Sequence, residues 1–399
     1  MRKNTNPLLF WSGLFLLFFP GLLHAYLLMP FPGSQDIEAI KLCYYLEKII
    51  LPLRVIGGLM VAWYLVKYFA KNTLPAKIFK GVVLVLLLGS LYVTDIQYKA
   101  SAMFEEPVTV RFANAMHNKV PENYIVLGVV NNGVAKAYPL VYLGYHHKVQ
   151  DNVGSLPVLV TYCTMCRTGR VYSPVINGVR QTFRLVGARH YNAIIEDEST
   201  GSWWYQATGE AAAGPMAGSH LNELPYEQST LSSWLDKHLG SLILQPDNHF
   251  KTDYADLKNY DRVQAVDRDS TLKNKDSILR KSWYVGLIVD KQPKAYNWRT
   301  LQKLCFVNDR IGTTSLLVAL EDDSLTFHAW NRRVDGKDLN FVIDTTGNLV
   351  DNETSSVWNW DGECTSGPNK GKRLAKIQAY QEYRHSWMHF HPGTLWWEK

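Results

Sequence analysis

The stretch G-E-A-A-A-G-P-M-A-G-S-H-L at residues 209–221 has a counterpart later in the chain, G-E-C-T-S-G-P-N-K-G-K-R-L at residues 362–374. Both begin with Gly-Glu, carry Gly-Pro in the middle and end with Leu, at an offset of 153 positions. The same offset continues downstream at three further pairs: Trp234 and Trp387, His238 and His391, and Gly240 and Gly393. Self-similarity at a fixed offset is the sequence signature of an internal repeat. The sequence therefore predicts a domain made of two similar halves.

Upstream of these stretches the offset is 158. Lys-Ala-Tyr at residues 136–138 matches Lys-Ala-Tyr at residues 294–296. The difference between the two offsets indicates a deletion in the second copy between Phe341 and Asp351, opposite residues 186–192 of the first copy.

The predicted outer domain has a first half at residues 101–246, a polar connector at 247–281 and a second half at 282–399. Short β-branched and aromatic runs, such as residues 124–130, alternate with Gly, Asn and Pro turns. We therefore expect a β-rich α+β domain whose two similar halves pack about a pseudo-two-fold axis.

Three apolar runs precede this domain, at residues 8–29, 49–70 and 78–96. Each is close to the roughly 20 residues that a helix needs to cross a bilayer. The first run is longer than the apolar part of a signal peptide, which has about 7–15 residues. The sequence predicts a membrane-anchored protein with three transmembrane α-helices within residues 1–98, in contact with the lipid bilayer.

The basic residues of this region indicate its orientation. Arg2 and Lys3 precede the first run, and four lysines surround the turn between the second and third runs: Lys67, Lys71, Lys77 and Lys80. Short cytoplasmic segments carry an excess of Lys and Arg. We expect a protein of the bacterial inner membrane with a cytoplasmic N-terminus and a periplasmic, extracytoplasmic domain. These six cations equal the formal net charge of +6, so the rest of the chain sums to zero, which argues against a nucleic-acid partner.

The segment V-T-Y-C-T-M-C-R-T-G-R-V-Y at residues 160–172 places Cys163 and Cys166 three positions apart in a chain with five cysteines. At an offset of 158, the second half has Glu321 and Ser324 in their places. If the halves share a fold, residues present in one half alone are not needed to make that fold. The comparison therefore favours a functional role for this pair.

The same comparison singles out three other residues. His147 lies opposite Cys305, and the loop that carries Arg189 and His190 is the part deleted from the second copy. These residues, with Arg167 beside Cys166, are candidates for a shared site.

A Cys-x-x-Cys pair can form one disulfide or supply two ligands to a soft metal. A structural zinc site with four protein ligands is disfavoured, because neither Cys305 nor Cys364 belongs to a second closely spaced cysteine pair. A c-type haem is excluded, because it would need His at the position of Arg167. A thiol redox pair, a copper site and a structural disulfide remain open, the last between Cys163 and Cys166 or between Cys305 and Cys364.

Each active alternative has its own residue set. In the redox interpretation Cys163 and Cys166 react, and Arg167, Arg189 and His190 favour the thiolate. In the copper interpretation the ligands are Cys163, Cys166, His147 and His190, because their side chains are soft or borderline donors. The turn after Cys166 leads into another strand, which is a poor match to thioredoxin.

Four segments resemble a bacterial family of domains of unknown function, number 3179: T-Y-C-T-M-C at 161–166, Y-N at 191–192, S-W-W-Y-Q-A-T-G-E at 202–210 and G-P-M-A-G-S-H-L at 214–221. Tyr138-Pro139-Leu140 matches the family's Y-P-L, whereas His190 replaces an apolar residue of the family pattern. The resemblance covers residues 110–399 and not the three spans. It implies an exported domain and no particular reaction.

Two functional hypotheses follow. The first is thiol redox or copper handling at the Cys-x-x-Cys site in the extracytoplasmic space. The alternative is a non-catalytic binding or scaffold subunit of a membrane protein complex, in which the cysteines form a structural disulfide.

Overall fold

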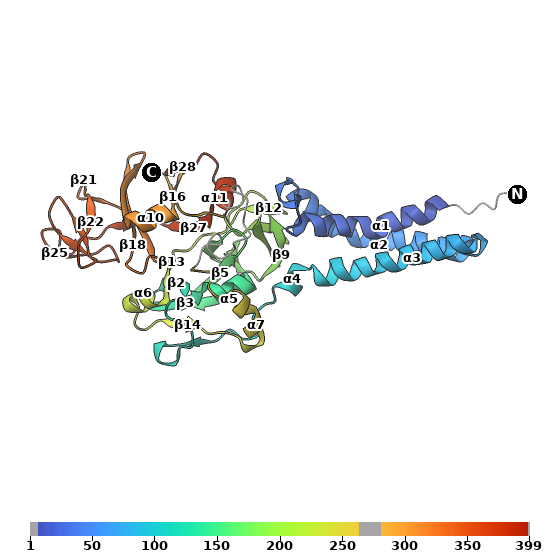
Figure 1. Cartoon of the computed structure of the whole chain (residues 1–399), viewed down its shortest axis with the longest axis horizontal. Helices are drawn as coiled ribbons and strands as arrows, with labels where there is room; N and C mark the ends of the chain where they lie inside the picture. Colours follow the sequence, from blue (N-terminus) through green and yellow to red (C-terminus); the bar gives the residue numbers. More distant parts are fainter. Residues whose placement is uncertain (1–6, 263–280, 398–399) are drawn as a thin grey trace. The chain divides into compact units, whose positions relative to one another are not determined.

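A computed structural model of the chain describes residues 7–262 and 281–397 (Figure 1). Arg2, Lys3 and most of the predicted connector lie outside the described residues. The chain divides into two compact units. The first comprises Met1–Glu105 and Gln181–His220, and the second comprises Glu106–Arg180 and Leu221–Lys399.

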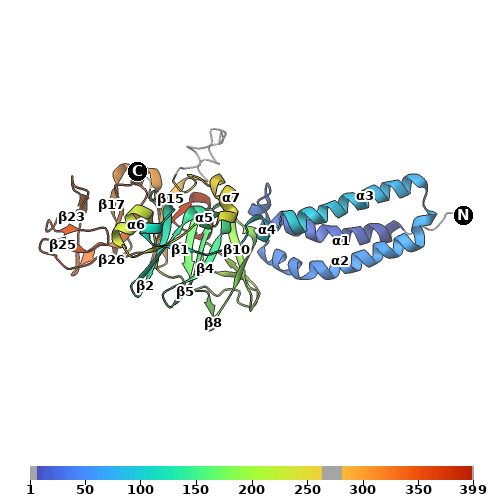
Figure 2. The same cartoon turned by 90° about the horizontal axis from the view of Figure 1, so that it is seen from below.

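Three long helices begin the first unit: α1 (Pro7–Leu28), α2 (Ile40–Tyr68) and α3 (Leu74–Tyr92). They lie side by side in both views (Figures 1 and 2). Each is long and apolar enough to cross a membrane, as the sequence predicts. A Cβ atom on Gly57 would lie 2.6 Å from the carbonyl oxygen of Gly13, so α1 and α2 approach closely where both lack side chains.

A four-stranded antiparallel sheet completes the first unit, in the order β12-β11-β10-β9. Its strands are β9 (Phe183–Arg189), β10 (Asn192–Asp197), β11 (Trp203–Tyr205) and β12 (Ala211–Ala213). Trp203 and Ile194 of this sheet share one apolar cluster with Leu28 of α1 and Cys43 of α2. This shared core explains why residues 181–220 group with the N-terminal helices and not with the rest of the predicted first half.

The second unit begins with a five-stranded sheet in the order β1-β14-β3-β2-β13. Its strands are β1 (Phe112–Ala113), β2 (Ile125–Asn131), β3 (Val134–Pro139), β13 (Glu227–Thr230) and β14 (Leu242–Leu244). A second sheet contains β4 (Lys148–Val153), β5 (Leu156–Cys163) and β6 (Thr168–Tyr172). Helix α5 (Leu140–His146) connects the two sheets, and α6 (Leu231–Lys237) follows β13.

The later part of this unit has the same order of elements. One sheet contains β27 (Ala379–Tyr383), β15 (Trp283–Val289), β16 (Gln292–Asn297) and β28 (Leu395–Trp397), and another contains β17 (Phe306–Ile311), β18 (Thr314–Leu320), β19 (Phe327–Asn331) and β26 (Ala375–Lys376). A third contains β22 (Phe341–Ile343), β23 (Leu349–Asp351), β24 (Val357–Trp358) and β25 (Cys364–Ser366). Along the chain, helix α10 (Trp298–Leu304) follows β16 as α5 follows β3, and α11 (Arg384–Phe390) follows β27 as α6 follows β13.

Shorter elements complete the described residues: η1 (Ser34–Asp36), η2 (Phe69–Lys71), η3 (Val93–Gln97), α4 (Ala100–Met103), η4 (Ala115–His117), β7 (Val175–Ile176), β8 (Val179–Arg180), η5 (Asn248–Phe250), α7 (Lys251–Asp256), β20 (Arg333–Val334) and β21 (Lys337–Asp338).

The repeated residues make matching contacts in the two parts. Trp234 of α6 covers Gly128, where a Cβ atom would lie 2.1 Å from the indole ring, and Trp387 of α11 covers Gly286 at 2.3 Å. Only glycine leaves room for an indole at this distance. The matched residues therefore make the same kind of helix-on-sheet contact in both parts.

Candidate functional site

Cys163 and Cys166 lie at the turn that joins β5 to β6. Cys163 is the last residue of β5 and pairs with Thr168, the first residue of β6. Arg167 has a φ of 56°, which lets the chain reverse within this short turn. Both cysteines are free thiols with 0% exposure. The motif therefore forms a buried hairpin turn, and not the strand-to-helix junction of thioredoxin.

His147 reaches this pair from the C-terminal end of α5. It has a φ of 62°, and its carbonyl oxygen accepts a hydrogen bond from the Tyr162 amide at 2.9 Å. The imidazole is 3% exposed and interacts with the Cys163 thiol. The structure thus brings together three of the residues that the sequence singled out.

The two thiols have opposite pKa shifts. Burial by itself raises the pKa of Cys163, but hydrogen bonds from Cys166 and His147 outweigh burial and hold this pKa well below its usual range. Burial and the neighbouring Cys163 raise the pKa of Cys166 well above its usual range. The arrangement therefore favours a Cys163 thiolate that accepts a hydrogen bond from a protonated Cys166.

Residues near the C-terminus surround Cys166. Its carbonyl oxygen accepts a hydrogen bond from the Tyr383 amide at 2.9 Å. The Thr168 hydroxyl interacts with the Cys166 thiol and also with the carboxylate of Glu382. Glu382 and its ion-pair partner Arg170 are 212 residues apart in the chain, and their side chains meet at 2.5 Å. Sequence analysis did not single out Thr168, although it lies two residues after Cys166, and it missed Glu382 because no local motif links that residue to the cysteines.

The Arg167 side chain contacts residues that are distant in the sequence. Its guanidinium group stacks on the Trp283 ring at 3.4 Å and donates to Gln381 Oε1 at 2.8 Å. It also donates to the carbonyl oxygens of Tyr260 and Asp261. Arg167 therefore ties the turn to three distant segments.

Arg189 and His190 belong to the other compact unit, at the tip of the β9–β10 hairpin. Arg189 Nη1 donates to the carbonyl oxygens of Leu27 at 2.6 Å and Ser34 at 2.9 Å. His190 Nε2 lies 3.0 Å from Glu38 Oε2. These contacts attach the hairpin to the end of α1 and to the segment that follows it. They give this hairpin a structural role.

The described residues offer little support for the copper prediction. Among them no group of three or more His, Cys, Asp or Glu side chains has an arrangement that could hold a metal ion. Cys305 is an exposed free thiol and Cys364 a buried one, so the structure has no disulfide between them.

The β18–β19 turn, which the offset of 158 matches to the cysteine turn, carries ionic groups in place of thiols. Glu321, opposite Cys163, accepts hydrogen bonds from Ser233 of α6 at 2.7 Å and from His328 at 2.6 Å if that ring nitrogen is protonated. Lys237 lies 3.0 Å from the same carboxylate. Burial opposes ionisation of Glu321, but these partners lower its pKa to about 2. This turn is therefore an ion-paired structural contact.

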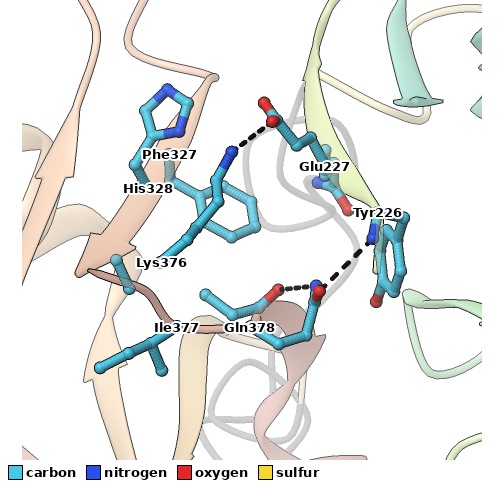
Figure 3. A pocket seen from close by; sticks show the side chains of 10 residues that line it. Tyr226, Glu227, Phe327, His328, Lys376, Ile377 and Gln378 are labelled. Carbon is cyan, nitrogen blue, oxygen red and sulfur yellow. Dashed lines mark hydrogen bonds and ion pairs between the residues drawn. The ribbon is translucent and has the colours of Figure 1, made fainter. Parts of the chain in front are cut away.

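A small pocket of about 30 Å³ adjoins this cluster (Figure 3). Its lining residues are Tyr226, Glu227, Gln228, Phe327, His328, Ala329, Lys376, Ile377, Gln378 and Ala379. Glu227 and Lys376 form an ion pair across it, as Figure 3 shows. A volume of this size suits about one water molecule, so the pocket does not provide a ligand site.

No curated protein and no solved structure matches this chain. Residues 105–394 match the model of a family described as "Protein of unknown function (DUF3179)". This match covers both the β5–β6 turn and the later strands that surround it, and the three apolar helices precede it. The chain belongs to the DUF3179 family.

Proposed function

We propose that this protein is a membrane-anchored thiol redox protein of the extracytoplasmic space. The apolar helices α1, α2 and α3 anchor it in the bacterial inner membrane with the N-terminus in the cytoplasm. The lysine-rich turn between α2 and α3 supports this orientation, since short basic segments stay on the cytoplasmic side. The family domain then faces the periplasm, where disulfides form and persist.

One observation carries the redox proposal: Cys163, Cys166 and His147 converge at one buried turn with opposite pKa shifts on the two thiols. A thiolate is the attacking species in disulfide exchange, and a nearby second thiol completes the reaction. The Cys163 thiolate attacks the disulfide of a partner and releases one partner thiolate. Cys166 then attacks the sulfur of Cys163, loses its proton and releases the second partner thiolate.

The domain consists of two related halves in this proposal, of which only the first reacts. The order β14-β3-β2-β13 in one sheet corresponds to β28-β16-β15-β27 in the other, and this order and the matching Trp-over-Gly contacts support a common origin. Glu321, Ser324 and Cys305 stand where the first half has Cys163, Cys166 and His147. The second half then serves to complete the site through β27 and α11.

The complete burial of both sulfur atoms favours a second candidate function. A disulfide between Cys163 and Cys166 would then brace a non-catalytic binding or scaffold subunit of a membrane protein complex. Exchange with a partner requires the β5–β6 turn to open, whereas a structural disulfide requires no access. The two candidates therefore differ in whether the thiols react in the folded protein.

Thiol counting and elemental analysis on protein purified from its native membrane distinguish these functions. The redox proposal predicts a metal-free protein in which a mild reductant opens the Cys163–Cys166 pair while the fold is intact. Cys163→Ser/Cys166→Ser protein should keep its melting temperature and lose this redox response. The matched control is Cys364→Ser, which removes another buried thiol. A pair that opens only on unfolding, with a lowered melting temperature in the double variant, supports the scaffold function. Stoichiometric copper would contradict both.

A further inference from the structure

Closure of the disulfide requires an acceptor for the proton of Cys166. In the resting pair Cys166 donates its hydrogen bond to Cys163. Once the Cys163 sulfur is bonded to a partner, it no longer carries the negative charge that would accept this proton. His147 forms a hydrogen bond with the Cys163 thiol. A group beside Cys166 is better placed to take the proton of Cys166.

The Thr168 hydroxyl provides a connection to such a group. It interacts with the Cys166 thiol on one side and with the Glu382 carboxylate on the other. A hydroxyl both accepts and donates hydrogen bonds, so it can relay a proton between two groups that do not touch. Ser386 Oγ donates to Glu382 Oε2 at 3.0 Å and lies 3.5 Å from the Thr168 hydroxyl. Ser386 therefore holds the carboxylate beside Thr168.

Glu382 is completely buried in a cluster of charged and phenolic groups. Arg170 forms its ion pair, and the titratable groups that face this cluster include Glu223, Tyr172, Tyr226, Tyr380, His391 and Cys166. Burial raises the pKa of Glu382 and the Arg170 charge opposes this effect, with a net pKa above the usual range. Glu223 lies 3.7 Å from Arg170 Nε, so a counter-charge remains for the guanidinium when Glu382 is neutral.

We propose that Glu382, on the second half of the domain, accepts the Cys166 proton through the Thr168 hydroxyl when the disulfide closes. This inference rests on the proposed redox function and extends it. In the balanced step the Cys166 proton passes to Thr168, and the Thr168 proton passes to the Glu382 carboxylate. The Cys166 sulfur bonds to Cys163, and the partner leaves as a thiolate. The dithiol loses two electrons, and the partner disulfide gains them.

The repeat supplies matched controls for this relay. Thr326 is the counterpart of Thr168 at the offset of 158, and Ser233 is the counterpart of Ser386 at the offset of 153. Thr326 is 0% exposed, as Thr168 is, but its hydroxyl donates to Asp323 at 2.6 Å. Thr326→Val and Ser233→Ala therefore remove equivalent hydroxyls without touching the thiol site.

The test measures the rate of disulfide closure in the full-length protein after mixing with glutathione disulfide across the neutral pH range. Free thiols are counted by acid quenching and alkylation at each time. Glu382→Gln and Thr168→Val should slow closure by about 100-fold, the lower end of the effect of positioned proton transfer. The deficit should shrink as the pH rises, because hydroxide then removes the Cys166 proton. Thr326→Val and Ser233→Ala should close at the wild-type rate.

Thr168→Val leaves the Arg170–Glu382 ion pair intact, so the test stands even if Glu382→Gln fails to fold. Closure of a folded Glu382→Gln or Thr168→Val protein at the wild-type rate would overturn the relay while the redox function stands. Equal slowing by the matched controls would overturn it too. A wild-type protein that never closes the disulfide would overturn the redox function and, with it, the relay.

Discussion

At the residue scale, the stability of the Cys163 thiolate depends on His147. We expect His147→Asn to raise the pKa of Cys163, because the substitution removes the imidazole that stabilises the thiolate. Asn tolerates the positive φ of 62° at this position better than most residues. The reactive thiolate exists above the pKa of its thiol, so the onset of Cys163 alkylation should move to higher pH. Peptide mass analysis of alkylated protein over a pH series checks this shift.

Cys305→Ser is the control for the His147 variant, because Cys305 occupies the matching position after α10 with a φ of 64°. This substitution should leave the pH profile of Cys163 unchanged. An identical profile in His147→Asn and the wild type would show that the imidazole does not stabilise the thiolate.

Three residues of the candidate site could be singled out from the sequence, and Glu382 could not. Cys163, Cys166 and His147 were singled out because the matching positions at the offset of 158 carry other residues. Glu382 was missed because its link to the turn depends on how two distant strands pack, which no local pattern records. Arg189 and His190 were candidates on the deletion alone, and the structure gives them the partners Leu27, Ser34 and Glu38.

At the element scale, a helix packs on a sheet through a Trp–Gly contact in both parts of the domain. Helix α6 packs on β2 in this way, and α11 packs on β15. Gly128→Ala and Gly286→Ala should each destabilise the domain, since the new Cβ atom would lie 2.1 or 2.3 Å from an indole ring. Overpacking of this kind costs about 1–3 kcal/mol. The control is Gly240→Ala, where a Cβ atom meets no atom within 4 Å. Thermal unfolding of the full-length protein in detergent measures the difference, and equal melting temperatures would contradict the assigned packing.

The turn that carries the cysteines should open more easily when its attachments are removed. The Tyr260 hydroxyl donates to the carbonyl oxygen of Thr164 in the middle of the turn. Tyr260→Phe removes this hydrogen bond, which is worth about 1 kcal/mol, or roughly a fivefold increase in the open population. Alkylation of the Cys163–Cys166 pair in the folded protein should accelerate by a similar factor. An unchanged rate would show that opening occurs elsewhere.

The apolar helices have a role in folding at the scale of the whole molecule. Strands β9–β12 lie within the family domain, yet Trp203 and Ile194 pack with Leu28 and Cys43 of the helices. A chain that begins after residue 98 should therefore expose this apolar face. We expect it to bind a hydrophobic dye and to aggregate. Cooperative unfolding without dye binding would show that the domain does not need the helices in order to fold.

The three apolar helices were predictable because each leaves a long apolar run in the sequence. The grouping of residues 181–220 with the helices was not, because the sequence does not show which apolar faces meet. The order of strands shared by the two parts agrees with the two-half organisation that we propose.

The most direct test of the redox function is a titration of the full-length protein, in native membranes, against mixtures of reduced and oxidised dithiothreitol. Alkylation with a mass tag then reports the thiols at each potential. The proposed function predicts that Cys163 and Cys166 change together in one reversible two-electron transition, while the free thiols of Cys305 and Cys364 do not take part. A pair that remains fully reduced or fully oxidised at every potential, until the protein unfolds, would contradict it.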